Sequence, residues 1–400
     1  MPFWLRAACC VLAFTATTAG GVLVARRFIP PDDVAPSYIC FWAGAKLVVA
    51  GQSPYDPASQ ARVQQQYGWN KATDGLGFWD FLPYYYPPSL MTPLSTLLVP
   101  LGYPLARLTW FVINVELFLL AGYLLRGVRT GVASWAPLVV VPLFAPSLYS
   151  MFVGQLVALI FVAIVVVWRL LQDRWDRTAG WLLAWITIKP QLTVLFLLAV
   201  LLWSARQRRW RVLHGFALGS VTLLAVSMAV IPSWPIDLIR AMLDQPLPTA
   251  DRPWVGSTWL LLLRTVGLHG WTLWVAYAAL ALPLLIVALR AALDRDARLP
   301  DVIALSLLVT FFVAPYARAY DFPILLIPLL LLLGGRLPAL WRAFLPTVFI
   351  VLPFVHLWRL AGGGVGFAFM PHVWLFWIPA LLTIAWIATM WRADVRPSGR

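Results

Sequence analysis

Charged and polar side chains interrupt the apolar runs of this chain at a few places, and their chemistry is that of a binding or catalytic site. Lys189 lies before Pro190 inside a long apolar run, and Gln191 follows. Arg318 and Asp321 lie between two strongly apolar runs. An ionisable group inside a membrane-spanning segment is costly, so each one is a candidate functional residue. The alternative for Arg318 and Asp321 is an ordinary connecting loop with a local ion pair.

Two further polar positions lie between or inside apolar runs. Gln155 follows Gly154 at the junction of two such runs, and Glu116 is the single glutamate of the chain. Glu116 and Asn114 could also form hydrogen bonds within a packed helix interface. That structural interpretation is the simpler one for Glu116.

A polar stretch near the N-terminus supplies aromatic rings and another cation. Residues 36–51 carry apolar side chains at helical spacing, which predicts a short amphipathic helix lying flat in the membrane interface. Lys46 on this helix either meets a lipid phosphate or snorkels to the headgroups. Tyr86 ends a run of three tyrosines that follows Asp80. Such tyrosines form an aromatic belt or stack on a sugar ring, and the belt is the simpler interpretation.

Together these groups predict a cavity at the outer membrane surface, with cations for a phosphate, carboxylates for proton transfer and aromatic rings for a sugar. The three cysteines form no CxxC pair, and the four histidines show no metal-binding spacing. Nothing in the sequence calls for a metal or a cofactor.

The composition requires a lipid environment for these groups. Of 400 residues, 62% are hydrophobic and only 12% are charged. A soluble domain has about 25% charged residues, so this chain lacks the polar surface that water requires. Its net charge of +14 lies in short arginine clusters between apolar runs. That arrangement is typical of cytoplasmic loops and argues against nucleic-acid binding.

Roughly ten or more apolar segments predict an all-α, polytopic transmembrane protein. We expect an N-terminal signal-anchor helix over 1–27, an extracytoplasmic loop over 28–86, a multi-helix membrane body over 87–391 and a cytoplasmic tail over 392–400. The net-acidic loop is placed outside because the arginine clusters mark the cytoplasm. The run 179–203 lies between two such clusters. It therefore predicts either a re-entrant hairpin bent at Lys189–Pro190 or one cluster on the outside.

The order of short motifs resembles glycosyltransferase family 87, membrane enzymes of the GT-C superfamily that take sugars from polyprenyl-phosphate donors. The resemblance runs from about Ser37 to about Pro328. The matching stretches are Phe41-Trp42-Ala43-Gly44-Ala45-Lys46, Gly51, Pro54-Tyr55-Asp56, Tyr86-Pro87-Pro88, Pro93-Leu94, Trp110, Gly154-Gln155, Lys189-Pro190-Gln191, Pro315-Tyr316 and Tyr320-Asp321.

The resemblance implies a GT-C-like fold whose first extracytoplasmic loop carries interfacial helices and an aspartate that acts as general base. The family's aspartate aligns with Ser37, whose hydroxyl cannot replace a carboxylate base at neutral pH. Asp33 is the candidate base and Asp32 its reserve; Asp80 and Asp321 are further carboxylates for the site. The other consequence of Ser37 is a protein that binds the lipid-linked sugar without turning it over.

The predicted function is transfer of a hexose, foremost mannose, from a polyprenyl-phosphate donor to an extracytoplasmic glycan or glycolipid acceptor. The cell membrane is the expected location. The cations Lys46, Lys189 and Arg318 are assigned to the phosphate, and the sugar or acceptor pocket is assigned to Tyr86, Gln155, Gln191, Tyr316 and Asp321. A transporter or flippase of lipid-linked sugars is the alternative from another class. The absence of an internal repeat in the sequence weakens it.

Overall fold

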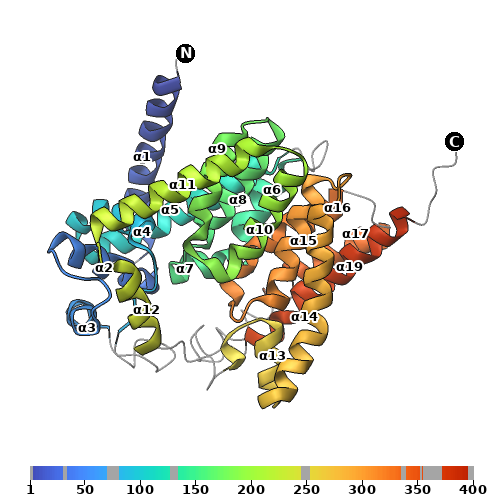
Figure 1. The fold of residues 1–400 in the computed structure, drawn as a ribbon. Helices are drawn as coiled ribbons and strands as arrows, with labels where there is room; N and C mark the ends of the chain where they lie inside the picture. The colour runs from blue at the N-terminus through green and yellow to red at the C-terminus, as the bar shows by residue number, and fades with distance from the viewer. Residues whose placement is uncertain are drawn as a thin grey trace.

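The computed structural model describes residues 3–29, 34–69, 81–126, 134–244, 253–334, 339–351, 354 and 372–394. Within these ranges every regular element is a helix, so the predicted all-α class is confirmed. The main helices (Figure 1) are α1 Phe3–Phe28, α2 Ile39–Val49, α3 Pro57–Gln65, α4 Pro88–Leu98, α5 Gly102–Leu124, α6 Ala136–Leu143, α7 Ala145–Val153, α8 Val157–Gln172, α9 Asp176–Trp185, α10 Pro190–Arg206, α11 Trp210–Val230, α12 Trp234–Asp244, α13 Trp259–Thr265, α14 Gly270–Leu293, α15 Leu299–Val313, α16 Leu326–Gly334, α17 Ala339–Pro346 and α19 Trp377–Asp394.

Helices of two lengths make up the membrane body. Among the described residues, three segments are long and apolar enough to cross a bilayer, namely Thr92–Leu124, Trp210–Val230 and Gly270–Leu293. The pair α6 and α7, bent by 53°, makes a fourth if it is one broken span. The other apolar helices here are shorter, between 10 and 17 residues. These helices are consistent with an all-α polytopic membrane protein. Fewer segments of the described residues are long enough to span than the ten or more apolar segments predicted, because many apolar runs form shorter helices.

Two long apolar runs are each divided into separate helices. Residues 257–290 contain α13 and α14, and residues 301–333 contain α15, a 3-10 helix over Ala319–Leu325 (η7) and α16. Pro315 and Pro323 lie in or beside the second break. Proline removes a backbone donor and clashes with the preceding turn, so an apolar run that contains it does not stay one helix.

Hydrogen bonds gather the arginine clusters at one end of the bundle. Arg169 near the end of α8 donates to the Leu124 carbonyl at the end of α5, at 2.6 and 2.9 Å. Arg209 before α11 donates to the Leu171 carbonyl of α8 at 2.7 Å and pairs with Asp176 at the start of α9. The ends of α5 and α8 and the starts of α9 and α11 therefore lie together.

The turn between α14 and α15 joins the same end. Arg206 Nε donates to the Leu293 carbonyl at 2.9 Å, and Gln207 Nε2 donates to the Arg295 carbonyl at 2.8 Å. We call this side the arginine end. The clusters around Arg169, Arg206 and Arg295 thus lie at the same end of the bundle. The side of the membrane on which they lie stays a prediction.

Of the two alternatives for the run 179–203, the structure has the hairpin that reverses at Lys189–Pro190. Helix α9 leaves the arginine end, a 3-10 turn follows over Ile186–Ile188, and α10 begins at Pro190 and returns to the arginine end at Arg206. Its 17 residues span about 25 Å at 1.5 Å per residue, so Lys189 lies deep below the arginine end. Thr193 Oγ1 donates to the Ile186 and Lys189 carbonyls at 2.9 and 3.1 Å. These bonds satisfy carbonyls left open by the proline break.

The opposite end holds the segment 34–69, and we call it the loop end. The Ala35 amide donates to the Phe152 carbonyl at 2.7 Å, and Trp110 Nε1 donates to the Gly154 carbonyl at 3.0 Å. Tyr103 of α5 donates to the Pro36 carbonyl at 3.1 Å. The start of the loop is thus anchored on α5 and on the turn between α7 and α8.

Gly154 lets the start of the loop approach the turn between α7 and α8 closely, because it has no side chain. Its φ is +82°, and a Cβ there would meet Ala35 Cα and Cβ at 2.8 Å. Gly154→Ala therefore combines backbone strain with a steric clash, and we expect a loss of about 2–3 kcal/mol in unfolding free energy. Gly51→Ala is the matched control, because φ is +71° and no atom lies within 4 Å. Equal thermal shifts for the two purified variants would contradict the close approach.

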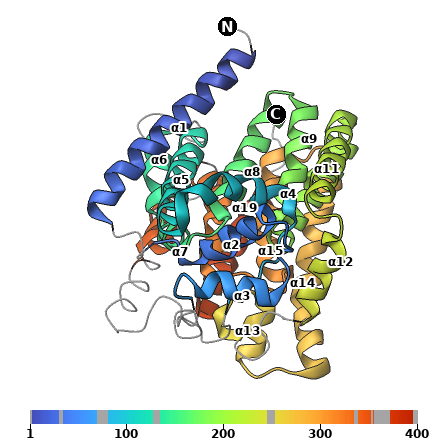
Figure 2. The ribbon, with the colours of Figure 1, turned by 90° about the vertical axis from the view of Figure 1, so that its left-hand side faces the viewer.

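Helix α1 packs antiparallel on α5 along the outside of the bundle (Figure 2). Thr18 Oγ1 donates to Glu116 Oε2 across this contact, and Asn114 Nδ2 donates to the Trp110 carbonyl at 2.9 Å. A Cβ on Gly21 would meet Val112 Cγ1 at 2.7 Å, so the two helices approach closely. Glu116 thus serves a helix interface, as its structural interpretation predicted.

Helix α2 forms within the predicted amphipathic segment, but its apolar side chains meet protein. Phe41, Trp42 and Leu47 are all buried, and α2 packs against α3, α4 and α5. Tyr38, just before α2, stacks on Trp110 with ring centres 5.2 Å apart. Hydrophobic periodicity alone does not distinguish a helix face turned to lipid from one turned to neighbouring helices.

Candidate functional site

Seven polar and aromatic residues from four elements meet at the loop end, and we call them the polar cluster. Its members are Tyr86, Tyr149, Lys189, Tyr316, Arg318, Tyr320 and Asp321.

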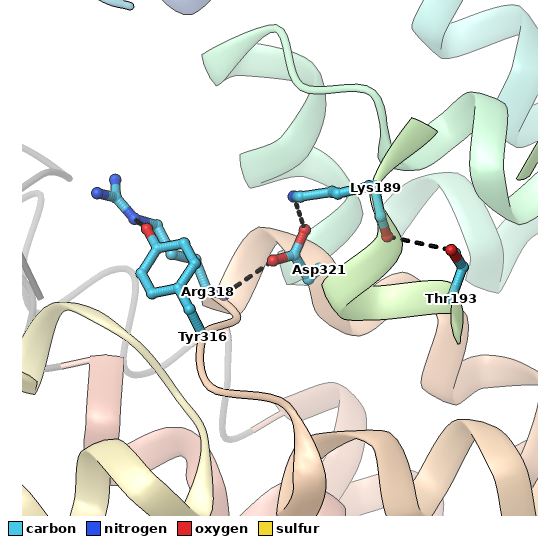
Figure 3. Close-up of polar contacts among 5 residues, drawn as sticks. All are labelled: Lys189, Thr193, Tyr316, Arg318 and Asp321. Atoms are coloured by element: carbon cyan, nitrogen blue, oxygen red, sulfur yellow. Dashed lines mark hydrogen bonds and ion pairs between the residues drawn. The ribbon is translucent and has the colours of Figure 1, made fainter. Parts of the chain in front are cut away.

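A buried ion pair lies at the centre of the polar cluster. Lys189 Nζ pairs with Asp321 Oδ1, and the two residues are only 3% and 1% exposed (Figure 3). The second oxygen, Oδ2, accepts the Arg318 amide at 2.9 Å. The expected local pair of Arg318 with Asp321 is therefore a backbone contact, and the ionic partner of Asp321 is the distant lysine. Both carboxylate oxygens have partners, so Asp321 positions Lys189 and the backbone of Arg318.

Arg318 points away from this pair. Its guanidinium lies on the far side of the Tyr316 ring from Asp321 (Figure 3), and Nε donates to the Tyr316 hydroxyl. The Cζ atom lies 5.6 and 5.8 Å from the ring centres of Tyr316 and Tyr320. Within the described part of the chain, the two terminal nitrogens have no hydrogen-bond partner. The ion pair is neutral, so the described residues of the cluster carry a net positive charge of one, on the planar guanidinium of Arg318. Its terminal nitrogens can bind two oxygens of a phosphate together.

Tyrosines surround these charges. Lys189 Nζ lies 4.8 Å from the Tyr320 ring centre, and the rings of Tyr149 and Tyr320 are 5.7 Å apart. Tyr86 lies near Asp321 and Tyr316. Phenolic hydroxyls donate and accept hydrogen bonds, so this wall suits sugar or phosphate oxygens.

Helix α3 holds Tyr86 in place. Gln64 brackets the Leu82 backbone, accepting from its amide and donating to its carbonyl, each at 2.8 Å. Tyr55 donates to the Tyr86 carbonyl at 2.7 Å. The carboxylate of Asp56 caps α3 by accepting the Ser59 amide at 2.9 Å. The Ser59 hydroxyl chiefly, and this amide in addition, lower the pKa of Asp56. The Pro54-Tyr55-Asp56 motif is thus explained by support of the returning loop.

Lys46 lies apart from the polar cluster. Its Nζ is 3.5 Å from the Tyr67 hydroxyl and 5.1 Å from the Trp42 ring centre. Phe41, five residues earlier on α2, faces Tyr86 at 4.9 Å between ring centres. Residues five apart on a helix lie on different faces, so α2 contributes to the cluster through Phe41.

The remaining predicted residues divide into two groups. Gln155 and Gln191 are half-buried, at the turn before α8 and at the start of α10, and neither side chain has a hydrogen bond within the described ranges. Asp32, Asp33 and Asp80 lie outside the described residues.

Tyr149 and Tyr320 belong to the polar cluster and Gln64 supports the loop that carries Tyr86, although none of the three was predicted as a site residue. Tyr320 lies in a motif that the resemblance included, and its proximity to Asp321 was the available signal. Tyr149 follows an apolar run and Gln64 belongs to a polar helix, so neither has a pattern of its own.

Comparison with known proteins agrees with this architecture. The model of glycosyltransferase family 87 matches residues 84–315, more than half of the chain. The match includes Tyr86, Gln155, Lys189 and Gln191 and ends just before Tyr316. No curated protein and no solved structure matches the chain. The chain belongs to glycosyltransferase family 87, a family of sugar-transferring enzymes.

Proposed function

We propose that this glycosyltransferase takes a hexose, foremost mannose, from a polyprenyl-phosphate donor and transfers it to a glycan or glycolipid acceptor at the loop end. The observation that carries the proposal is Arg318, a cation beside the Tyr316 and Tyr320 rings whose terminal nitrogens have no hydrogen-bond partner among the described residues. The arginine end matches cytoplasmic loops by charge, so the loop end is assigned to the extracytoplasmic side of the cell membrane.

The proposed reaction is a substitution at the anomeric carbon of the sugar. The acceptor oxygen forms a bond to this carbon while the bond from carbon to phosphate oxygen breaks. The leaving polyprenyl phosphate keeps the electron pair, and its growing charge is stabilised by Arg318, with Lys189 as the second cation. The acceptor proton passes to a carboxylate as the new bond forms.

Asp33 is proposed as that carboxylate, with Asp32 in reserve. The position after it is firmly anchored: Arg107 Nε donates to the Val34 carbonyl at 2.6 Å, and Val34 is fully buried. Asp321 is poorly suited to the role because Lys189 and the Arg318 amide already occupy its oxygens.

A lateral groove supports a lipid-linked donor. A cavity of about 190 Å³ is lined by Pro87, Thr187, Leu223 and Leu224 among others. Thr187 lies two residues before Lys189, and Pro87 follows Tyr86. Leu224 is 51% exposed on α11, a candidate membrane span, so the groove reaches the surface that α11 turns to lipid. We assign the isoprenoid chain to this groove.

Blocking the groove is expected to act on the donor's lipid. Leu224→Trp narrows it, so we expect about a tenfold higher KM for a long polyprenyl donor and little change for a short-chain analogue, since about 1.4 kcal/mol is tenfold. Leu218→Trp is the matched control, because Leu218 is equally exposed on α11 and does not line the cavity. The same KM change in both variants, or with both donors, would exclude this route.

Arg318→Ala tests the phosphate assignment. Losing a charge-assisted contact of about 1.5–3 kcal/mol is expected to weaken donor binding by about 10- to 100-fold. Arg318→Lys keeps the charge without the fork and should recover part of the affinity. Arg264→Ala, on α13, removes a charge outside the polar cluster and serves as the control. Donor affinity is measured with purified protein and labelled polyprenyl-phosphate-mannose, and unchanged affinity in Arg318→Ala would overturn the assignment.

The overall proposal is tested by release of polyprenyl phosphate from the same donor in nanodiscs with candidate acceptors. Release that depends on the acceptor supports transfer. Binding without turnover, across several sugars and acceptors, would instead support a silent lipid-sugar binding protein. Movement of intact donor between leaflets would support a flippase.

A further inference from the structure

The arginine end contains a second cavity, separate from the polar cluster. Its volume is about 600 Å³, and it lies between the α10–α11 turn and the end of α14. Its charged lining consists of Arg206, Arg208 and Arg295, and its apolar lining includes Leu202, Trp210 and Leu293.

The three guanidinium groups still have N–H donors that could bind a ligand. Arg206 uses Nε for the Leu293 carbonyl at 2.9 Å, and no other hydrogen bond of its guanidinium is present within the described ranges. Arg208 and Arg295 are exposed, and their side chains have no partner in the same ranges. Among the described residues, no carboxylate lines the cavity. Asp294 and Asp296 flank Arg295 in sequence, and neither forms an ion pair with the three arginines in these ranges.

The backbone keeps the cavity in shape. Gln207 Nε2 donates to the Arg295 carbonyl at 2.8 Å, so the turn before α11 and the turn after α14 are tied together. Trp203 Nε1 donates to the Ala297 carbonyl at 3.0 Å, which adds a second tie. The arginines are therefore presented by two connected turns, not by independent loops.

The apolar lining distinguishes this place from a simple basic patch. Trp210 is 55% exposed and Leu293 is 47% exposed, both beside the arginines. Exposed tryptophan next to arginine at the end of a membrane span is typical of the headgroup level. A ligand with a phosphate and an adjoining apolar part would satisfy both linings at once.

We propose that this cavity binds a phosphate group, with an anionic phospholipid headgroup as the favoured source and a soluble phosphate compound as the other. Basic pockets between membrane helices on the cytoplasmic side are suited to anionic lipids. The site is unrelated to the sugar donor, which is assigned to the opposite end. Binding of such a lipid would make the stability of the enzyme depend on the lipid composition of the membrane leaflet at the arginine end.

The test compares two double variants that lose equal charge at the same end. Arg208→Gln/Arg295→Gln alters the cavity, and Arg177→Gln/Arg290→Gln removes two exposed arginines that do not line it. Delipidated protein in detergent is titrated with phosphatidylglycerol, and adducts are counted by native mass spectrometry. At about 1 kcal/mol for each arginine, we expect about 30-fold weaker binding for the cavity variant and near wild-type binding for the control.

Glycerol 3-phosphate and phosphatidylcholine separate the sources. Tight phosphatidylglycerol binding without competition from glycerol 3-phosphate supports the lipid source, and full competition supports the soluble source. Equal loss in the two variants, or equal binding of phosphatidylcholine, would overturn the site. Matching melting temperatures of both variants in lipid-free detergent ensure that lost binding is not lost folding.

Discussion

Replacing Lys189 by methionine is expected to destabilise the protein by about 3–5 kcal/mol, because it leaves the carboxylate of Asp321 buried without its cation. Asp321 is 1% exposed, so water cannot take the place of the ammonium. The loss is measured as a lower melting temperature of the purified variant, and turnover is expected to fall as well because the polar cluster loses its centre.

A double variant distinguishes the effect of an unpaired buried charge from the effect of altered side-chain packing. Lys189→Met/Asp321→Leu removes both charges and leaves apolar groups of similar size, so part of the stability is expected to return. The return is incomplete because the Arg318 amide loses its acceptor, Asp321 Oδ2. Transferase activity is not expected to return, since the cation is missing. If the single and double variants melt at the same temperature, the ion pair is not what stabilises this region.

The ion pair of Lys189 and Asp321 also positions the backbone of Arg318. Asp321 holds Lys189 with one oxygen and the Arg318 amide with the other. The reversal between α9 and α10 is thereby joined to the 3-10 helix η7 between α15 and α16. The backbone of Arg318 is fixed, and among the described residues the terminal nitrogens of its guanidinium have no partner. A preorganised phosphate contact requires this arrangement.

Local patterns predicted much of the fold. Apolar runs, arginine clusters and the proline after Lys189 indicated helices, a common arginine end and a hairpin, because each depends on neighbouring residues. The partner of Lys189 was different. Asp321 is 132 positions away, and no local pattern distinguishes pairing with Arg318 from pairing with a distant lysine.

In the first loop, too, the sequence pattern predicted the helix but not its tertiary contacts. The apolar spacing of residues 36–51 predicted a helix, and α2 is there. The spacing did not indicate that α3, α4 and α5 would cover it, so Lys46 was placed with the other cations although it lies near Trp42 and Tyr67. Coverage depends on elements far along the chain.

Asp33→Asn is expected to lower turnover by about 10²- to 10⁴-fold, the usual effect of removing a general base, while donor affinity stays near wild type. The amide keeps the size of the carboxylate but cannot accept the acceptor's proton. The measurement is release of polyprenyl phosphate from labelled donor at saturation, combined with direct donor binding.

Asp32→Asn is the matched control, one residue further from the anchored Val34 carbonyl. Loss of turnover in Asp33→Asn with near-normal turnover in Asp32→Asn would establish a base upstream of Ser37. The reverse pattern would move the base to Asp32. Normal turnover in both variants would exclude this segment and leave Asp80 as the carboxylate to test, since Asp321 already has two hydrogen-bond partners.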